Sequence, residues 1–434
     1  MYKKIPALLA VLAILAVIPI FAAQSRSTEF HKTGLKISKN LTFNVKFPNG
    51  YFLKGTVQGP TGAAVEEAFV FVIDASEKYS GYLGATDKAG KFSIPVQAGK
   101  KYLRIAPPIS ESVDPARFSR LLEKIVEGIN VTKDTTLSPI KLKNGYILSG
   151  KVDPPAGSGA LKSFGPGIGI FPTNSMELFA AAQTDGPNDD INNKYAVALP
   201  AGSYRMVASA NGATAANQII PMLPRIIPVK ISKDTAKNIT ILKGGYNLSG
   251  TVKDSSQTKL DGFLFIIPKS GNFKDGVLAL CGVDEGVFGY DTDLNLKNLF
   301  LPSGSYTLMF VPTVYMSTEY KGKATVSYFD LTMPAAAKTL ALVAKNGFVV
   351  SGKGTDANGK AMQAIILASN KNAQISLNLL GINLMFAVSD TKGSYRFALP
   401  ADTFNLQALP IPSDSSALPR EKILQRMIRT AISR

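Results

Sequence analysis

A nine-residue phrase that occurs four times constrains the architecture of this chain more than any other feature. The copies occupy residues 49–57, 144–152, 244–252 and 346–354, and the first reads NGYFLKGTV. The seventh position of each copy is a glycine, and these glycines lie 95, 100 and 102 residues apart. That period exceeds the roughly 20 to 50 residues of a solenoid repeat and suits one small domain. We therefore expect four copies of one domain.

The phrase itself has the alternation of a β-strand with one buried face. Every second residue from Tyr51 to Val57 is apolar, aromatic or glycine, and the residues between them are mostly polar. Successive side chains of a strand point to opposite faces, so one face is predicted to be buried, including the tyrosine, and the other solvated. The inward glycine, Gly55 in the first copy, is expected to allow another element to approach the backbone closely.

Three further elements recur after each phrase and predict the rest of an all-β domain. An apolar strand comes first, a turn of pattern D-x-x-G-x-aromatic follows in two copies, and a Pro-containing turn with glycine in three copies precedes the next strand. The apolar strands are residues 69–73, 168–171, 263–267 and 365–367, the turns are 87–92 and 390–395, and the Pro-containing segments begin at 94, 199, 301 and 399.

A short segment before each phrase decides where the domains begin. Residues 37–41, 131–135 and 231–235 share the pattern Ser/Thr-Lys-Asp/Asn, and residues 337–340 are a weaker fourth copy. We interpret this segment as the first strand of the domain that follows it, because this division gives four complete units. The predicted boundaries are a signal peptide at 1–23, a linker at 24–35, and β-sandwiches at 36–128, 129–228, 229–328 and 329–434.

Two segments interrupt the β pattern with helical spacing. Residues 114–126 place Phe118, Leu121 and Ile125 on one helical face, and residues 419–432 carry a similar apolar stripe with basic residues opposite it. We expect short helical insertions in the first and fourth domains. They could cover a sandwich edge, or the basic carboxyl-terminal helix could make a peripheral membrane contact.

The amino terminus indicates export. Lys3 and Lys4 precede an apolar stretch from Ile5 to Ala23, which is followed by polar chain. This layout is typical of a cleaved signal peptide, and the alternative is an uncleaved membrane anchor. The single cysteine, Cys281, lies far from the cleavage region, so lipidation of an amino-terminal cysteine is excluded. The predicted location is secreted, periplasmic or on the cell surface.

The charge suggests the class of partner. The chain carries a formal net charge of +17, and its basic residues are scattered instead of forming a dense run. For an exported protein, this surplus favours an envelope or extracellular polymer, a glycan or a protein as partner, and no nucleic acid is expected. A basic surface with no specific partner is the alternative.

The order of these motifs resembles the carboxypeptidase regulatory-like domain. The shared features are the aromatic-x-L-x-G-x-V strand, the apolar strand, the D-x-x-G-x-[FY] turn and the L-P-x-G-x-Y segment, and the resemblance covers about residues 36–410. It implies four tandem seven-stranded antiparallel β-sandwiches of the Ig-like or transthyretin-like (prealbumin-like) kind. It carries over no catalytic residue, and it implies accessory, adhesive, glycan-associated or scaffold roles.

Catalysis is not expected from the residues present. The only histidine, His31, is predicted to be a solvated linker residue, and Cys281 follows an apolar run and is predicted to be a buried small hydrophobe. With one histidine, neither a multi-histidine metal site nor a Ser-His-Asp triad fits. A hydrolase that uses loop carboxylates remains the least favoured class.

Two kinds of ligand contact are nevertheless predicted. Carboxylates gather in an acidic loop at Asp185, Asp189 and Asp190 and around Asp284 and Asp291, and such oxygens could hold Ca²⁺. Turn-forming acidic residues are the alternative. The chain has no tryptophan, so exposed tyrosines are the best candidates for glycan contacts. The tyrosines that lie in polar loops are Tyr79, Tyr82, Tyr315 and Tyr320.

Together these features predict a non-catalytic exported protein that acts as a structural or adhesive scaffold or as a binding protein. Short connections between the domains favour a stiff or gently jointed rod. The alternative function is carbohydrate binding, with or without calcium.

Overall fold

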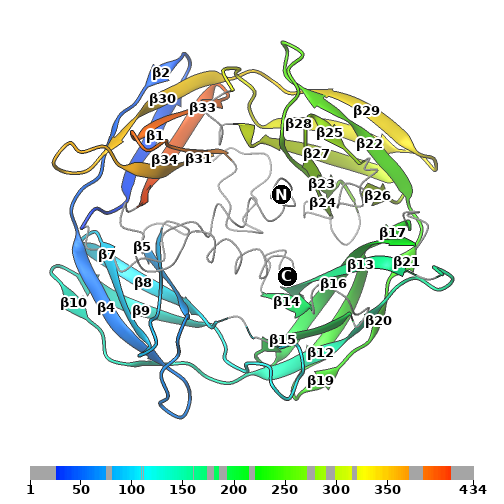
Figure 1. Ribbon diagram of the computed structural model, residues 1–434, viewed down its shortest axis with the longest axis horizontal. Helices are drawn as coiled ribbons and strands as arrows, with labels where there is room; N and C mark the ends of the chain where they lie inside the picture. The colour runs from blue at the N-terminus through cyan, green and yellow to red at the C-terminus, as the bar shows by residue number, and fades with distance from the viewer. Residues whose placement is uncertain are drawn as a thin grey trace.

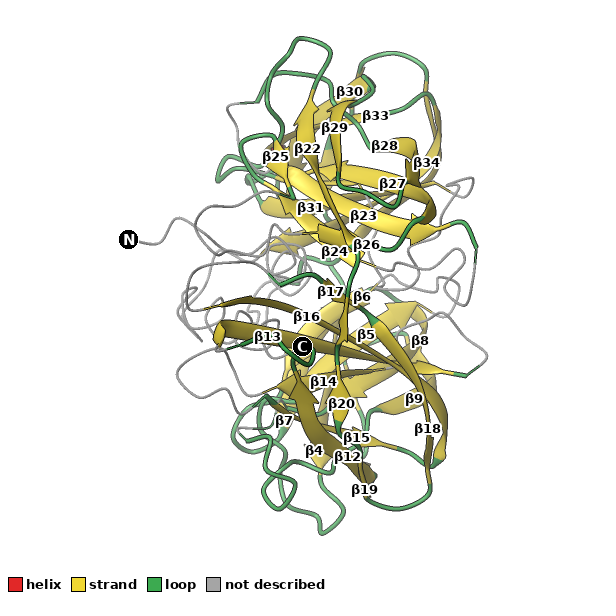
Figure 2. Ribbon diagram, turned by 90° about the vertical axis from the view of Figure 1, so that its right-hand side faces the viewer, coloured by secondary structure: helices red, strands yellow, loops and turns green. Residues whose placement is uncertain are grey.

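The computed structural model describes residues 26–74, 81–108, 110, 112–159, 161–173, 180–184, 193–214, 220–270, 279–289, 299–314, 320–370 and 385–411. Every element assigned among them is a β-strand, which confirms the all-β prediction (Figure 2). The described residues contain no helix with the length and apolar composition that crossing a bilayer requires.

The strands form four modules, and each module has an outer and an inner layer of strands. In the first module the outer sheet holds β4 (Tyr51–Gln58), β7 (Lys91–Val96), β10 (Thr135–Thr136) and β11 (Ile140–Lys141), and the inner sheet holds β5 (Phe69–Asp74), β6 (Gly81–Ala85), β8 (Gly99–Ala106) and β9 (Lys124–Val131). In the second module the outer strands are β12 (Tyr146–Asp153), β15 (Lys194–Leu199), β19 (Thr235–Ala236) and β20 (Ile239–Thr240), and the inner strands are β13 (Leu161–Pro172), β14 (Ala180–Thr184), β16 (Gly202–Thr214) and β18 (Arg225–Ile231). In this module β14 also pairs with β15, so the two layers are parts of one eight-stranded sheet. β17 (Met222–Leu223) and β21 (Leu242–Lys243) form a separate short antiparallel pair.

The other two modules repeat this order. In the third the outer strands are β22 (Tyr246–Lys253), β25 (Val287–Phe288), β26 (Leu299–Leu301) and β29 (Lys338–Val343), and the inner strands are β23 (Gly262–Pro268), β24 (Ala279–Val283), β27 (Gly304–Pro312) and β28 (Ser327–Met333). In the fourth the outer strands are β30 (Phe348–Thr355), β33 (Ser394–Leu399), β2 (Leu41–Thr42) and β3 (Val45–Lys46), and the inner strands are β31 (Gln363–Asn370), β32 (Met385–Val388), β34 (Asp402–Ile411) and β1 (Phe30–Ile37).

The four modules surround a common centre and form a ring (Figure 1). The sheets that contain the repeated phrase lie on the outside of the ring, and the sheets built on β5, β13, β23 and β31 lie toward the middle. Each module has a hydrophobic core of its own between its two sheets. Figure 2, a view from the side, shows the third and fourth modules above the first and second.

The amino-terminal segment closes the ring by completing the fourth module. β1 pairs antiparallel with β34, with Phe30 opposite Ala408 and Ile37 opposite Asp402. β2 and β3 pair parallel with β30. The side chains of Ile37, Val45 and Phe47 are at most 2% exposed and belong to the core of the fourth module. Strands from the two ends of the chain therefore share one sandwich.

This closure corrects three expectations. The Ser/Thr-Lys-Asp/Asn segment does not begin the domain that follows it, because its strands pair with the preceding module: β10 and β11 with β4, β19 and β20 with β12. The strands of the first copy pair with the fourth module. The predicted linker at 24–35 contains the start of β1, and a ring replaces the predicted rod.

The repeated glycine and the repeated Asp/Asn explain why this pairing recurs. A Cβ at Gly150, Gly250 or Gly352 would overlap a backbone carbonyl oxygen of the last strand, so glycine lets that strand approach the phrase, as predicted. At Gly55 a Cβ would instead overlap the ring of Phe92. The Asp/Asn side chain then accepts a hydrogen bond from a backbone N–H of the phrase. These bonds join Asp134 to Phe52, Asp234 to Ile147 and Asn40 to Val349, each at 3.0 Å. The amino-terminal copy thus uses the same contact as the two internal copies.

The predicted helix at 114–126 is wrong. Residues 115–117 form a turn, and β9 begins at Lys124 and pairs with β8. The β-branched Ile125 and Val126 favour a strand, and the open edge of β8 supplies hydrogen-bond partners, which outweighs the helical spacing of the apolar residues. The predicted helix at 419–432 and the signal peptide lie outside the described residues.

Candidate functional site

The modules meet at four seams that share one backbone contact. At each seam, the segment before the last inner strand of one module accepts a hydrogen bond from a glycine N–H just before the outer strand of the next. The four distances from the glycine nitrogen to the carbonyl oxygen are 2.8 Å for Gly50 to Arg26, 2.7 Å for Gly145 to Arg120, 3.1 Å for Gly244 to Pro221 and 2.8 Å for Gly347 to Lys323.

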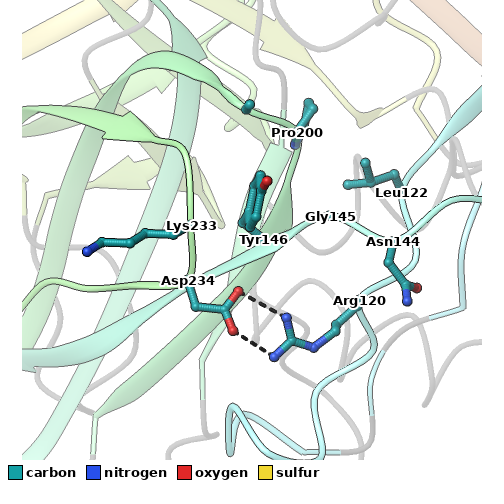
Figure 3. A pocket seen from close by; sticks show the side chains of 9 residues that line it. Arg120, Leu122, Asn144, Gly145, Tyr146, Pro200, Lys233 and Asp234 are labelled. Carbon is teal, nitrogen blue, oxygen red and sulfur yellow. Dashed lines mark hydrogen bonds and ion pairs between the residues drawn. The ribbon is translucent and has the colours of Figure 1, made fainter.

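A pocket opens at the seam between the first and second modules. Its volume is about 760 Å³, which falls in the range of small-molecule sites. Leu122, Tyr146 and Pro200 supply apolar surface, and polar groups surround it (Figure 3). The full lining is Arg120, Leu122, Asn144, Gly145, Tyr146, Pro200, Ala201, Lys233 and Asp234.

An ion pair across the seam orders the polar side of this pocket. The Arg120 guanidinium donates two hydrogen bonds to the Asp234 carboxylate, at 3.0 and 2.7 Å (Figure 3). Asp234 also accepts the Ile147 N–H. The hydrogen bonds from Arg120 lower the pKa of Asp234, with a smaller contribution from Ile147. The carboxylate is therefore a hydrogen-bond acceptor of low basicity, suited to binding and poorly suited to removing a proton.

Tyr146 is the aromatic group of the pocket. Its ring stands between Pro200 and the Arg120–Asp234 pair in Figure 3, and the residue is 38% exposed. Tyr51 and Tyr246, its equivalents in other copies of the phrase, are each 36% exposed. The prediction that these tyrosines are buried is wrong. Each is the first residue of its strand, where the chain has not yet entered the core. The aromatic residue that recurs at this position of the phrase is the sequence feature that could have identified Tyr146 as a pocket residue.

The seam between the fourth and first modules has the same polar groups. Arg26 donates two hydrogen bonds to Asp134, both of 2.9 Å, and Asp134 accepts the Phe52 N–H. The Arg26 guanidinium also lies over the Phe52 ring, 4.8 Å from its centroid. The hydrogen bonds from Arg26 lower the pKa of Asp134 to about 2, and the Phe52 N–H adds to the effect. Sequence reasoning missed both arginines, because their partners lie 108 and 114 residues away.

The pKa of Asp134 supplies a direct test of this seam. We expect the carboxylate to titrate near 2 in the folded protein, against about 3.9 when unfolded. A depressed carboxylate pKa stabilises the folded state above the unfolded value, and this contribution is lost as the pH falls through about 2. Carbon-13 NMR of the Asp134 carboxyl carbon would measure it. In Arg26→Gln the value should return toward the ordinary one, and a pKa near 4 in the unmodified protein would contradict the ion pair.

The described residues include only two of the predicted contact residues, Tyr82 and Tyr320. Asp185, Asp189, Asp190, Tyr79 and Tyr315 lie outside the described residues, and Tyr82 lies on β6 opposite Val72. Tyr320 lies at the seam between the third and fourth modules. Its hydroxyl donates to Asp254 at 3.0 Å and accepts the Ala324 N–H at 3.1 Å. Burial raises its pKa to about 12, so this tyrosine is a packed seam residue.

The remaining chemical candidates are structural. Cys281 is 2% exposed, which confirms that it is buried. His31 lies on β1 and is not a linker residue; its Nε2 is 3.6 Å from Oε1 of the buried Glu29. Burial is the main cause that raises the pKa of Asp261, which lies beside Asp284 and Glu285. Within the described part of the chain, no group of three or more His, Cys, Asp or Glu side chains is arranged to hold a metal ion.

Comparison with known proteins identifies no family for this chain. No family model and no curated protein matches the chain. Among solved structures, the Bacillus anthracis TIE protein is 14% identical over 68% of this chain and 51% of its own, with a TM-score of 0.18. The chain therefore spans about half the length of that protein. BcpA, the major pilin subunit of Bacillus cereus, is 13% identical over 68% of this chain and 99% of its own, with a TM-score of 0.18.

A third structure, GBS52, the minor pilin of Streptococcus agalactiae, is 11% identical over 45% of this chain and 97% of its own, with a TM-score of 0.22.

Proposed function

We propose that this is a non-catalytic, exported protein that uses its ring of four β-sandwich modules as a scaffold for binding. The observation that carries the proposal is the pocket at the first–second seam, in which Tyr146, Asn144 and the Arg120–Asp234 pair face solvent together. The ligand is an extracellular or envelope polymer, a glycan or a protein. The signal-peptide pattern at 1–23 supports export.

Ring closure suits this role, because it fixes the seams relative to one another. A row of sandwiches joined only by linkers would bend at every junction. Here each seam has a backbone hydrogen bond, and the pairing of β1 with β34 inside the fourth module closes the ring. Polar groups held in place before the ligand arrives lose less conformational entropy on binding.

The pocket chemistry supports binding over catalysis. Asp234 accepts hydrogen bonds from Arg120 and Ile147, which favour its ionised carboxylate form. Two N–H groups of the Arg120 guanidinium donate to this carboxylate.

The modules are further proposed to be carboxypeptidase regulatory-like domains. Support comes from the motifs, and from a strand order in which the phrase pairs antiparallel on one side and parallel with the last strand on the other. Calcium-assisted carbohydrate binding is the second candidate, based on the acidic loop at 185–190.

Replacing Tyr146 tests the pocket. We expect Tyr146→Ala to weaken ligand binding about tenfold, because about 1.4 kcal/mol of aromatic contact is lost. Glycan arrays with and without calcium, followed by biolayer interferometry on each hit, would measure the change. Since Tyr146 is 38% exposed, the melting temperature should change little. Unchanged affinity for every hit would remove the pocket from the proposal.

A further inference from the structure

Two of the four seams carry the same set of polar and aromatic side chains. The fourth–first seam has Arg26, Asn49, Tyr51, Lys133 and Asp134, and the first–second seam has Arg120, Asn144, Tyr146, Lys233 and Asp234. In each set the asparagine, the tyrosine and the lysine are exposed. We propose that these seams are two copies of one binding site and that together they hold a single acidic polysaccharide chain along the outside of the ring. This inference rests on the proposed function of the first–second pocket.

The two sets share the chemistry of sugar recognition. An exposed tyrosine ring offers a flat apolar face against which a sugar ring can pack. The Arg–Asp pair and the asparagine amide are planar polar groups that can donate to and accept from neighbouring hydroxyls. In both seams the pair is built identically, with two guanidinium bonds to the carboxylate at 2.7 to 3.0 Å.

Charge selects an acidic ligand. Each arginine is neutralised by its aspartate, so the exposed lysine beside the pair, Lys133 or Lys233, leaves a net positive charge at each site. At the fourth–first seam Lys54 adds a second positive charge close to Asp134. The chain as a whole has a net charge of +17, which adds a long-range attraction for anions. A polysaccharide that carries a carboxylate on each sugar satisfies both the aromatic face and this charge.

The other two seams differ in the groups that matter. Pro221 occupies the place of the arginine before Tyr246, so that seam has no cation at this position. At the third–fourth seam, Phe348 replaces the tyrosine and Asn40 replaces the aspartate. Among the described residues, the bidentate Arg–Asp pair is therefore confined to the two seams that flank the first module.

The position of the two sites explains why a polymer is expected. The first module contributes Tyr51 and Asp134 to one site and Arg120 to the other, so the sites are separated by the width of one module, roughly 30 Å. A chain that reaches both sites binds the second as an intramolecular event and gains affinity over a short oligomer, by 10²- to 10⁴-fold in favourable geometry.

Binding of galacturonate oligomers of increasing length tests this inference. For the unmodified protein, we expect the affinity for polygalacturonate to exceed that for the trimer at least a hundredfold. Tyr51→Ala and Tyr146→Ala should each reduce the polymer affinity at least tenfold, and the double variant should reduce it further. Tyr246→Ala is the matched control, because Tyr246 is equally exposed but has no Arg–Asp pair, and it should bind like the unmodified protein.

The lysines and a neutral polymer test the acidity of the ligand. Lys133→Gln with Lys233→Gln should weaken polygalacturonate binding, and dextran should bind at least a hundredfold more weakly than polygalacturonate. Equal affinity for trimer and polymer, or an equal loss in Tyr246→Ala, would overturn the two-site inference. The two-site inference would also be overturned if the protein bound a neutral glycan through Tyr146 and did not bind polygalacturonate. That result would still support the proposed binding function of the pocket. Loss of the proposed function requires that Tyr146→Ala changes no binding at all.

Discussion

Deletion of residues 26–47 is expected to unfold the fourth module, although the deletion removes none of residues 348–411. The deleted segment supplies three of the eight strands of that module, β1, β2 and β3, and the buried side chains of Ile37, Val45 and Phe47. Truncating a buried Phe or Ile to Ala typically costs about 2 to 5 kcal/mol. The free energy lost with all three side chains and the strand pairing exceeds the free energy of unfolding of a typical domain, about 5 to 15 kcal/mol.

Hydrogen exchange measured by mass spectrometry would show the effect. Amides of β30, β31 and β34 should lose their protection, and those of the second module should keep it. A synthetic peptide of residues 26–47, added in trans, should restore protection in the fourth module, because the strand pairing and the core contacts do not need a covalent link. Full protection of β34 after the deletion would contradict the closure.

Gly150→Ala is expected to destabilise the second module by about 3 kcal/mol or more. Its Cβ would overlap the carbonyl oxygen of Lys237, on the segment that leads from β19 to β20, and backbone cannot rotate away as a side chain can. The hydrogen bond from the Tyr195 hydroxyl to the same oxygen, 2.6 Å long, would be strained as well. Urea unfolding followed by circular dichroism would measure the loss.

Gly165→Ala is the matched control for this prediction. Gly165 also lies in a strand of the second module, has no positive φ, and has nothing within 4 Å of the position of a Cβ. Alanine there should change the stability by less than about 0.5 kcal/mol or raise it slightly. Equal destabilisation in both variants would show that the close approach of the last strand is not the reason for the repeated glycine.

The local elements of each module could be predicted from the sequence. Alternation placed the phrase on a strand, and the Pro-containing segments marked the turns between β15 and β16 and between β33 and β34. These turns are not the predicted hairpins, because each connects an outer strand to an inner strand that does not pair with it. The turn at Asp87 has the expected form, with its carboxylate accepting the N–H groups of Ala89 and Lys91. These features depend on neighbouring residues only, so local propensity decides them.

Ring closure and the seams could not be predicted, because both depend on residues far apart in the chain. The Asn40 side chain accepts the Val349 N–H, and the two residues are 309 positions apart. No local sequence pattern indicates that Asn40 pairs with the fourth module. The domain boundaries were chosen so that each unit was complete in sequence, and this choice assigned the first copy of the segment to the first module. In a closed ring, that copy instead completes the fourth module. The segment at 114–126 failed for a related reason, since the edge of β8 determines its strand.

Small-angle X-ray scattering of the purified protein tests the closed ring most directly. A compact chain of this length has a radius of gyration of about 22 Å, and a ring should give about 22 to 26 Å. Four sandwiches in an open row should give roughly 40 Å, with an extended pair-distance distribution. We predict the smaller value. A radius near 40 Å would show that β1 and β34 are apart in solution, and would contradict the ring.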